Sequence, residues 1–155
     1  GPIDVLVNNA GAAVHGAVQD ADMAEWRDVL DVNFTATAAL TRQVLPDMIE
    51  RERGAIINIS SINGRHVNAG PASYAATKNA TTGFSGCLFE DVRGHGIKVS
   101  TIMPGFVATD MTAPLGKDGT RMIQPHDIAE AVAFVLAASP ACCPTEIVIR
   151  PQRQP

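Results

Sequence analysis

This chain of 155 residues has few aromatic residues, and neither positive nor negative charge strongly predominates in it. Phe, Trp and Tyr together make up 5% of the sequence, and the net charge is −4. Lys and Arg are scattered rather than gathered into a basic stripe, which argues against nucleic-acid binding. No apolar run approaches the ~20 residues that a membrane helix needs, and no charged-then-apolar leader marks secretion. We therefore expect a cytoplasmic protein that binds neither nucleic acid nor membrane.

Cysteine is also rare, with only Cys87, Cys142 and Cys143 in the chain. Two of them are adjacent, a spacing at which a disulfide bridge rarely forms, and none belongs to a Cys-x-x-Cys pair. The four histidines do not combine with cysteines or carboxylates at metal-ligand spacing. We expect reduced thiols and no metal site.

The chain does contain a regular alternation of short apolar runs and longer helical patterns. Apolar residues make up 46% and charged residues 18%, which is ordinary for one globular domain. The apolar runs predict buried strands at residues 3–11, 55–60, 97–105 and 145–151. The helical patterns cover residues 20–54, 71–96 and 125–139. This order predicts an α/β fold with a doubly wound parallel sheet and helices on both faces.

Some helix boundaries can also be predicted. The pattern over residues 20–54 is expected to form two helices with a break near residues 31–33. We expect Gly54 to end the second of these helices and Gly94 to end the next one, because glycine commonly closes helices.

Polar and glycine residues follow three of the predicted strands, at residues 8–11, 60–61 and 104–105. In parallel sheets, ligands bind beyond the carboxyl ends of the strands. The sequence therefore predicts a ligand site at this edge of the sheet.

The only tyrosine, Tyr74, stands four residues before Lys78. On a helix, residues four apart share a face. A free phenol has a pKa of about 10, which a nearby cation lowers, and a change of about three units takes roughly 4 kcal/mol. The pair is therefore either a tuned proton donor or an ordinary solvated pair on a helix surface.

Five motifs occur in register along the chain. They are NNAG at residues 8–11, Asn33 in DVNFT, Ser61 in INISSING, Tyr74-x-x-x-Lys78, and PGFVATDM at residues 104–111. Ser61 lies thirteen residues before Tyr74. In order and spacing, these motifs resemble the compact single-domain branch of the short-chain dehydrogenase/reductase family, and the resemblance covers nearly all of the chain.

The resemblance implies a catalytic set of Asn33, Ser61, Tyr74 and Lys78. Tyr74 would exchange a proton with an alcohol or carbonyl oxygen, and Ser61 would hold that oxygen. Lys78, together with a cationic nicotinamide ring, would lower the pKa of Tyr74, and Asn33 would hold a water that links Lys78 to solvent. Two readings stay open at this point: Ser60 competes for the role of Ser61, and Asn33 could be a helix cap.

The resemblance also implies NAD or NADP as the cofactor that carries the hydride. The residues implied in binding it are Asn9, Ala10, Gly11, Tyr74, Lys78, Pro104, Gly105, Val107 and Thr109. The first three would lie beside the adenosine ribose, and the last four would lie against the nicotinamide. His15 and His66 are candidates for the lining of the substrate pocket.

The sequence departs from the family at both ends. Many members end in a Gly-rich segment, whereas this chain ends TEIVIRPQRQP, an ending that resembles a subgroup of reductases acting on small hydroxy acids and varied carbonyls. The glycine-rich turn that seats the cofactor pyrophosphate is not found in the sequence. We therefore expect residues 1–155 to be the C-terminal, catalytic part of a single domain, with a partial Rossmann-like sheet that lacks the first βαβαβ portion. The first strand is then expected to form an exposed edge, and this chain alone is expected to be poorly soluble and nearly inactive.

The leading prediction is an NAD(P)-dependent oxidoreductase that interconverts a secondary alcohol and a carbonyl on a small substrate. Only thirteen residues separate Met111 from Pro125, and so short a loop favours a small substrate. The resemblance implies a homodimer or homotetramer, formed through the helices at residues 34–52 and 71–93.

Three alternatives differ from this prediction in kind. Halohydrin dehalogenases share the scaffold, but they carry Arg where this chain has Lys78. Extended sugar-nucleotide epimerases share Tyr-x-x-x-Lys, but they are longer and lack the NNAG and PGFVATD patterns. The third alternative is a non-catalytic fragment or pseudoenzyme that serves only as an oligomerisation module.

Overall fold

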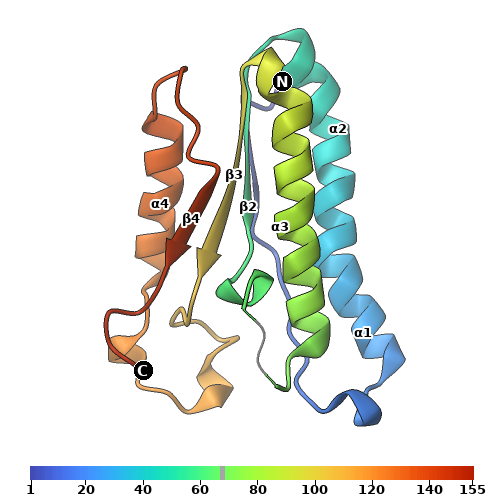
Figure 1. Ribbon diagram of the computed structural model, residues 1–155, viewed down its shortest axis with the longest axis vertical. Helices are drawn as coiled ribbons and strands as arrows, with labels where there is room; N and C mark the ends of the chain where they lie inside the picture. The colour runs from blue at the N-terminus through green and yellow to red at the C-terminus, as the bar shows by residue number, and fades with distance from the viewer. Residues whose placement is uncertain (67–68) are drawn as a thin grey trace.

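A parallel sheet of four strands lies at the centre of the computed structural model, which describes residues 1–66 and 69–155 (Figure 1). The strands follow one another across the sheet in chain order, as β1 (Val5–Asn8), β2 (Gly54–Ile59), β3 (Ile97–Pro104) and β4 (Glu146–Ile149). Every pairing between neighbouring strands is parallel. Each strand lies within one of the predicted apolar runs, except that β2 begins one residue earlier, at Gly54, so the prediction of an α/β fold with a parallel sheet is confirmed.

Helices cover both faces of this sheet. They are α1 (Met23–Leu30), α2 (Ala36–Glu50), α3 (Ala72–Val92) and α4 (Pro125–Ala137). Figure 1 shows α2 and α3 side by side on one face, with α1 continuing the line of α2, and α4 on the other face. The sheet is therefore covered on both sides, as the sequence predicts.

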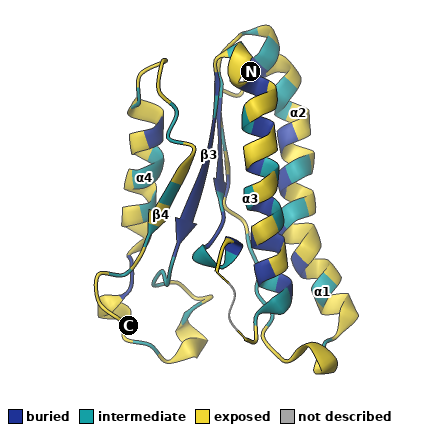
Figure 2. Ribbon diagram, viewed as in Figure 1, coloured by how far each residue is buried: buried dark blue, intermediate teal, exposed yellow. Residues whose placement is uncertain are grey.

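Neighbouring residues of the strands supply the two layers of the core. Ile56 packs in a cluster with Met48 on the side of α2 and α3. Ile57, the next residue of β2, packs instead with Ile102 and Val135 on the side of α4. This alternation follows from the two-residue repeat of a strand, and it explains why the strands are almost continuously apolar. Figure 2 shows the resulting burial of β3 along nearly its whole length.

Strand β1 forms one edge of the described sheet and is only partly covered. Val5 and Val7 are 39% and 40% exposed, whereas Leu6 packs against the core on the side of α2 and α3. The expectation that the first strand is an exposed edge is confirmed.

The two predicted helices are present and α1 ends where the break is predicted, but the chain does not leave helical geometry there. The backbone keeps right-handed helical geometry and passes through a π-helical segment, Asp31–Thr35, which joins the two helices. This segment contains no glycine or proline that would stop a helix. Its central residue, Asn33, is buried, and its side chain bonds to the backbone of Ala12. A π turn adds one residue to the turn, and such turns are frequent at functional sites.

The two predicted glycine stops are wrong. Gly54 belongs to β2, where an added Cβ would come within 2.5 Å of Met48 Sδ, so glycine is needed there for close packing. Gly94 lies inside a 3-10 turn, Arg93–His95, that follows α3. Gly96 ends this turn with a φ of 69°, a left-handed conformation that glycine adopts without steric cost.

Three further findings concern membranes, metals and thiols. Across residues 1–66 and 69–155, no helix combines the length and the apolar character that a bilayer crossing requires. In the same part of the chain, His, Cys, Asp and Glu side chains form no group of three or more that could hold a metal ion. Cys87, Cys142 and Cys143 form no disulfide with one another in the described part of the chain.

Candidate active site

A cavity of about 290 Å³ lies at the carboxyl ends of the strands, where the sequence predicts a ligand site. The loops that follow β1, β2 and β3 enclose it together with the start of α3, and Figure 1 shows these segments at the lower end of the molecule. The predicted residues Ser61, Tyr74 and Gly105 line this cavity, along with His15 and Lys117. The fold therefore brings together residues from loops that are far apart in the sequence.

Helix α3 carries Tyr74 and Lys78 on one face, as the spacing predicts. Lys78 Nζ lies 5.6 Å from the centroid of the Tyr74 ring. The same ammonium donates a hydrogen bond to the carbonyl oxygen of Ile59 at the end of β2 (2.9 Å). Tyr74 is half-buried at the cavity, whereas Lys78 is only 4% exposed. The reading of this pair as an ordinary solvated surface pair is therefore wrong.

Burial sets the pKa values of both side chains. It lowers the pKa of Lys78 from 10.5 to about 8, because the ammonium loses its hydration. It also raises the pKa of Tyr74 above 10.0, and interaction with the Ser61 hydroxyl offsets part of that rise. Tyr74 is consequently a protonated phenol at neutral pH. The predicted lowering of its pKa by Lys78 together with a cationic nicotinamide ring stays a prediction, because it concerns the protein with its cofactor bound.

The structure separates the two serines that follow β2. Ser61 lines the cavity, and its Oγ accepts a hydrogen bond from the N–H of Asn63 (3.1 Å), which leaves its own proton available for donation. Ser60 is buried against α3, where its hydroxyl donates to the carbonyl oxygen of Lys78 (2.9 Å) and lies 3.0 Å from Thr82 Oγ1. Of the two serines, only Ser61 lines the cavity.

Asn33 connects the π-helical segment to two other parts of the site. Its Oδ1 accepts from the N–H of Ala12 (2.7 Å), and its Nδ2 donates to the carbonyl oxygen of Ala12 (2.9 Å). The Nδ2 also donates to Thr77 Oγ1 (2.9 Å), and the Thr77 hydroxyl in turn donates to the carbonyl oxygen of Tyr74 (2.8 Å). Asn33 lies inside the helical segment and does not cap a helix. Sequence reasoning missed Thr77, whose only signal is its place directly before Lys78.

The residues predicted to contact the adenosine ribose follow β1. Asn9 and Ala10 are exposed, and Gly11 is half-buried. A Cβ added at Gly11 would lie 3.6 Å from Asn33 Oδ1 and 3.7 Å from Lys78 Nζ. This turn therefore lies directly beside two of the predicted catalytic side chains.

The residues predicted to contact the nicotinamide follow β3. Pro104 is buried at the end of the strand, and Gly105 lines the cavity. An added Cβ at Gly105 would come within 2.9 Å of Pro151 Cδ, so this position has no room for a side chain. Val107 is half-buried and Thr109 is exposed, and neither is among the described residues that line the cavity.

The two candidate histidines have different positions. His15 lines the cavity, whereas His66 is exposed and is not among the described lining residues. Lys117 also lines the cavity, and its Nζ lies 4.6 Å from the centroid of the Phe106 ring. Lys117 belongs to none of the motifs in the sequence, so sequence reasoning missed it.

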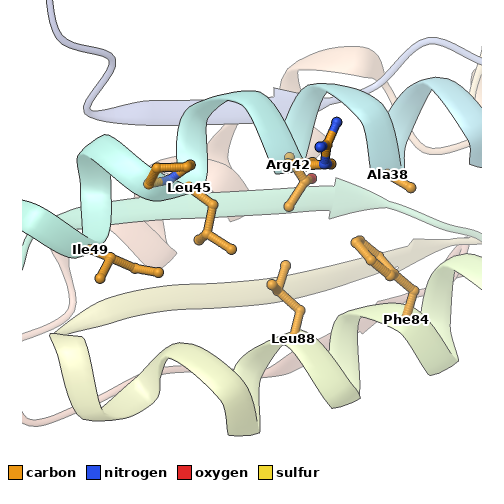
Figure 3. A pocket seen from close by; sticks show the side chains of 8 residues that line it. Ala38, Arg42, Leu45, Ile49, Phe84 and Leu88 are labelled. Carbon is orange, nitrogen blue, oxygen red and sulfur yellow. The ribbon is translucent and has the colours of Figure 1, made fainter.

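A second hollow, of about 280 Å³, lies between α2 and α3 (Figure 3). The residues that line it are Ala38, Thr41, Arg42, Leu45, Pro46, Ile49, Phe84 and Leu88. We call it the α2–α3 groove. Most of these side chains are apolar, so the groove differs in chemistry from the cavity that Tyr74 lines.

Comparison with known proteins agrees with the motifs. The family model for short chain dehydrogenases matches residues 1–120. The 3-oxoacyl-(acyl-carrier-protein) reductase of Vibrio cholerae is 37% identical over 150 residues, covering 90% of this chain and 61% of the relative. The acetoacetyl-CoA reductase of Allochromatium vinosum is 40% identical over 145 residues, covering 87% and 59%. The chain thus spans about three fifths of the length of these relatives.

The fold of the chain is also similar to that of a solved short-chain oxidoreductase. A metagenomic short-chain oxidoreductase in complex with NADP superposes with a TM-score of 0.83 at 34% sequence identity. The match covers 99% of this chain and 63% of that protein.

Proposed function

The chain belongs to the short-chain dehydrogenase/reductase family, and on that premise we propose a reaction for it. The proposed function is NAD(P)-dependent interconversion of a secondary alcohol and a carbonyl on a small substrate, with residues 1–155 as the catalytic part of one domain. The observation that carries this proposal is the convergence of Tyr74 and Ser61 on one cavity, with the buried Lys78 one helical turn away.

Tyr74 is the proposed proton donor. Burial raises its pKa, so the side chain keeps its phenolic proton at neutral pH and can donate it to a carbonyl oxygen. As the proton leaves, the Lys78 ammonium stabilises the phenolate that remains. Oxidation uses the reverse transfer, from an alcohol to the phenolate. The Ser61 hydroxyl donates to the same substrate oxygen and fixes its position.

The residues around Lys78 fit a nicotinamide cofactor, which supplies or accepts the hydride when it is bound. Gly11 has no side chain to fill the space beside Asn33 and Lys78, and Asn9 and Ala10 before it are exposed. We propose that the cofactor is held by Asn9, Ala10, Gly11, Tyr74, Lys78, Pro104, Gly105, Val107 and Thr109. The proposal covers NAD and NADP alike.

Replacement of Ser61 with Ala tests this function. We expect kcat/KM for carbonyl reduction to fall by about 10²- to 10³-fold, because the developing oxyanion loses one donor. The assay follows the absorbance of the reduced nicotinamide, with a panel of short ketones and the protein encoded by the full reading frame. If the wild-type protein reduces none of them with either cofactor, the proposed function is wrong.

Ser60→Ala is the matched control for this experiment. It removes a hydroxyl that is bonded inside the core, so we expect a loss of about 1–3 kcal/mol in the free energy of unfolding, with most of the activity retained. The opposite result, in which Ser60→Ala is inactive and Ser61→Ala is active, would exchange the roles of the two serines.

The position of Lys78 argues against the alternatives. A halohydrin dehalogenase carries Arg there, and the longer epimerases lack the motifs that flank the cavity. In a purely structural module, the buried Lys78 ammonium, with its pKa lowered to about 8, would reduce the stability of the fold and serve no purpose. Perturbed groups of this kind gather at catalytic sites, which favours an active enzyme.

We also propose that two copies of the chain pair through the α2–α3 groove, as the family resemblance implies. Gly83 is exposed on α3, and an added Cβ would meet nothing within 4 Å. The substitution Gly83→Arg is therefore compatible with the protomer, and it adds a long cation next in sequence to Phe84, which lines the groove. We expect it to convert a dimer or tetramer to a smaller species in light scattering, whereas Gly83→Ala should preserve the assembly. An unchanged mass for Gly83→Arg would place the interface elsewhere.

A further inference from the structure

Lys117 gives the cavity beside Tyr74 a fixed positive charge. It lies between two 3-10 turns, Ala113–Leu115 and Gly119–Arg121, in the segment that follows β3. Its ammonium lies 4.6 Å from the centroid of the Phe106 ring, and both side chains line the cavity. A cation at this distance from an aromatic ring is attracted by the ring, which helps to hold the ammonium at the cavity wall.

No carboxylate of the protein neutralises this charge within the described part of the chain. Lys117 forms no ion pair there, and none of the described lining residues is Asp or Glu. The neighbouring Asp118 is already paired with Arg121 (3.2 Å) and accepts from the Thr120 hydroxyl (2.6 Å). The ammonium is therefore available to a ligand.

The remaining walls of the cavity are largely apolar, with Ala13, Ile62, Pro71, Phe106, Met111 and Leu115 among them. A volume of about 290 Å³ is at the lower end of the range for ligand sites, so it suits a small molecule. Tyr74 and Ser61 fix the position of the reacting oxygen, and Lys117 offers a single cation elsewhere on the same cavity. One lysine suits a monoanion, because phosphate groups are usually held by several donors, often from arginine.

We propose that the substrate is a small hydroxy acid or oxo acid whose carboxylate binds Lys117 while its reacting oxygen meets Tyr74 and Ser61. This inference rests on the proposed oxidoreductase function and narrows it to a substrate class. The charge-assisted contact selects acids over neutral molecules of the same shape.

The test compares short 2- and 3-hydroxy acids with their methyl esters in the protein encoded by the full reading frame. We expect kcat/KM to favour the acid over its ester by about tenfold or more, as a hydrogen bond to a charged group allows. Lys117→Met should lower this ratio by about tenfold, and Lys117→Arg should retain most of it. Arg153→Met is the matched control, because Arg153 is exposed, lines a different hollow and carries the same charge.

A binding measurement separates this inference from the proposed function. Titration calorimetry with the same acids and esters needs no turnover. If the acids bind in a Lys117-dependent way but the protein turns over neither them nor any ketone of the panel, the carboxylate site stands and the proposed reaction is overturned. Suppose instead that turnover requires Tyr74, but the ratio of kcat/KM for acid to kcat/KM for ester is the same in wild type and Lys117→Met. This result would overturn the inference about Lys117 and leave the proposed reaction intact. Binding of none of the acids, or a wild-type preference for the esters, would also overturn it.

Discussion

Tyr74→Phe is expected to lower kcat by about 10²- to 10⁴-fold in either direction of the reaction, with a much smaller change in KM. The substitution removes the only phenol in the chain and keeps the aromatic ring that lines the cavity. Substrate binding should survive, because the ring and the Ser61 hydroxyl remain in place. Steady-state kinetics of the protein encoded by the full reading frame, with reduced and oxidised nicotinamide in turn, measures both constants.

The fold should tolerate this substitution. The Tyr74 hydroxyl interacts with the Ser61 hydroxyl at the cavity and not with the core, so we expect a change of less than about 1 kcal/mol in the free energy of unfolding. Loss of activity with an unchanged unfolding midpoint would therefore be a chemical effect. A variant that keeps more than about a tenth of the wild-type kcat would exclude Tyr74 as the proton donor.

The pH dependence of the reaction rate provides a second test of the role of Tyr74. Burial raises the pKa of Tyr74, so the proton-donating form persists to alkaline pH. Tyr74 therefore stays protonated, but carbonyl reduction in the wild type should decline above about pH 8, where Lys78 loses the charge that stabilises the phenolate. Alcohol oxidation should increase as the pH rises toward the pKa of Tyr74. Tyr74→Phe should remove both dependences from whatever activity remains.

The parts of the site that could be predicted from the sequence are those encoded by local spacing. Tyr74 and Lys78 share a face because a helix repeats every 3.6 residues, and the position of Ser61 follows from the end of an apolar strand. The two layers of the core were predictable for the same reason, since a fully buried parallel strand is apolar at nearly every position.

The parts that could not be predicted depend on contacts between distant segments. The π-helical turn at Asn33 forms where that side chain bonds to Ala12, twenty-one residues away. Lys117 reaches the cavity because the segment after β3 folds back, with Val107 bridging to Ile123. Burial raises the pKa of Tyr74, and the spacing of Tyr74 and Lys78 reveals the neighbouring cation but not the degree of burial. Local patterns carry none of this information.

Lys78→Met is expected to remove activity and to raise stability at the same time. Each pKa unit is worth about 1.4 kcal/mol, so a pKa lowered from 10.5 to about 8 costs about 3 kcal/mol of folding free energy at neutral pH. Methionine avoids that cost but loses the hydrogen bond to the Ile59 carbonyl oxygen, worth about 1 kcal/mol. We expect a net gain of about 2 kcal/mol at pH 7 in urea unfolding, with kcat reduced by at least about 100-fold because the phenolate of Tyr74 loses its cation.

The pH dependence of stability identifies the buried ammonium as the cause. Below about pH 8, Lys78 is protonated in both the folded and the unfolded state, so the full cost is present. Between about pH 8 and 10.5, the unfolded state keeps a proton that the folded state releases, and stability must rise with pH. This rise should be absent from Lys78→Met and present in Tyr74→Phe. Above pH 10, the wild type should lose stability, because the raised pKa of Tyr74 lets the unfolded state release the phenolic proton more readily than the folded state. Tyr74→Phe should not show this loss. A Lys78→Met protein that is less stable than wild type at pH 7, with the wild-type rise intact, would mean that the ammonium is solvated rather than buried beside Tyr74.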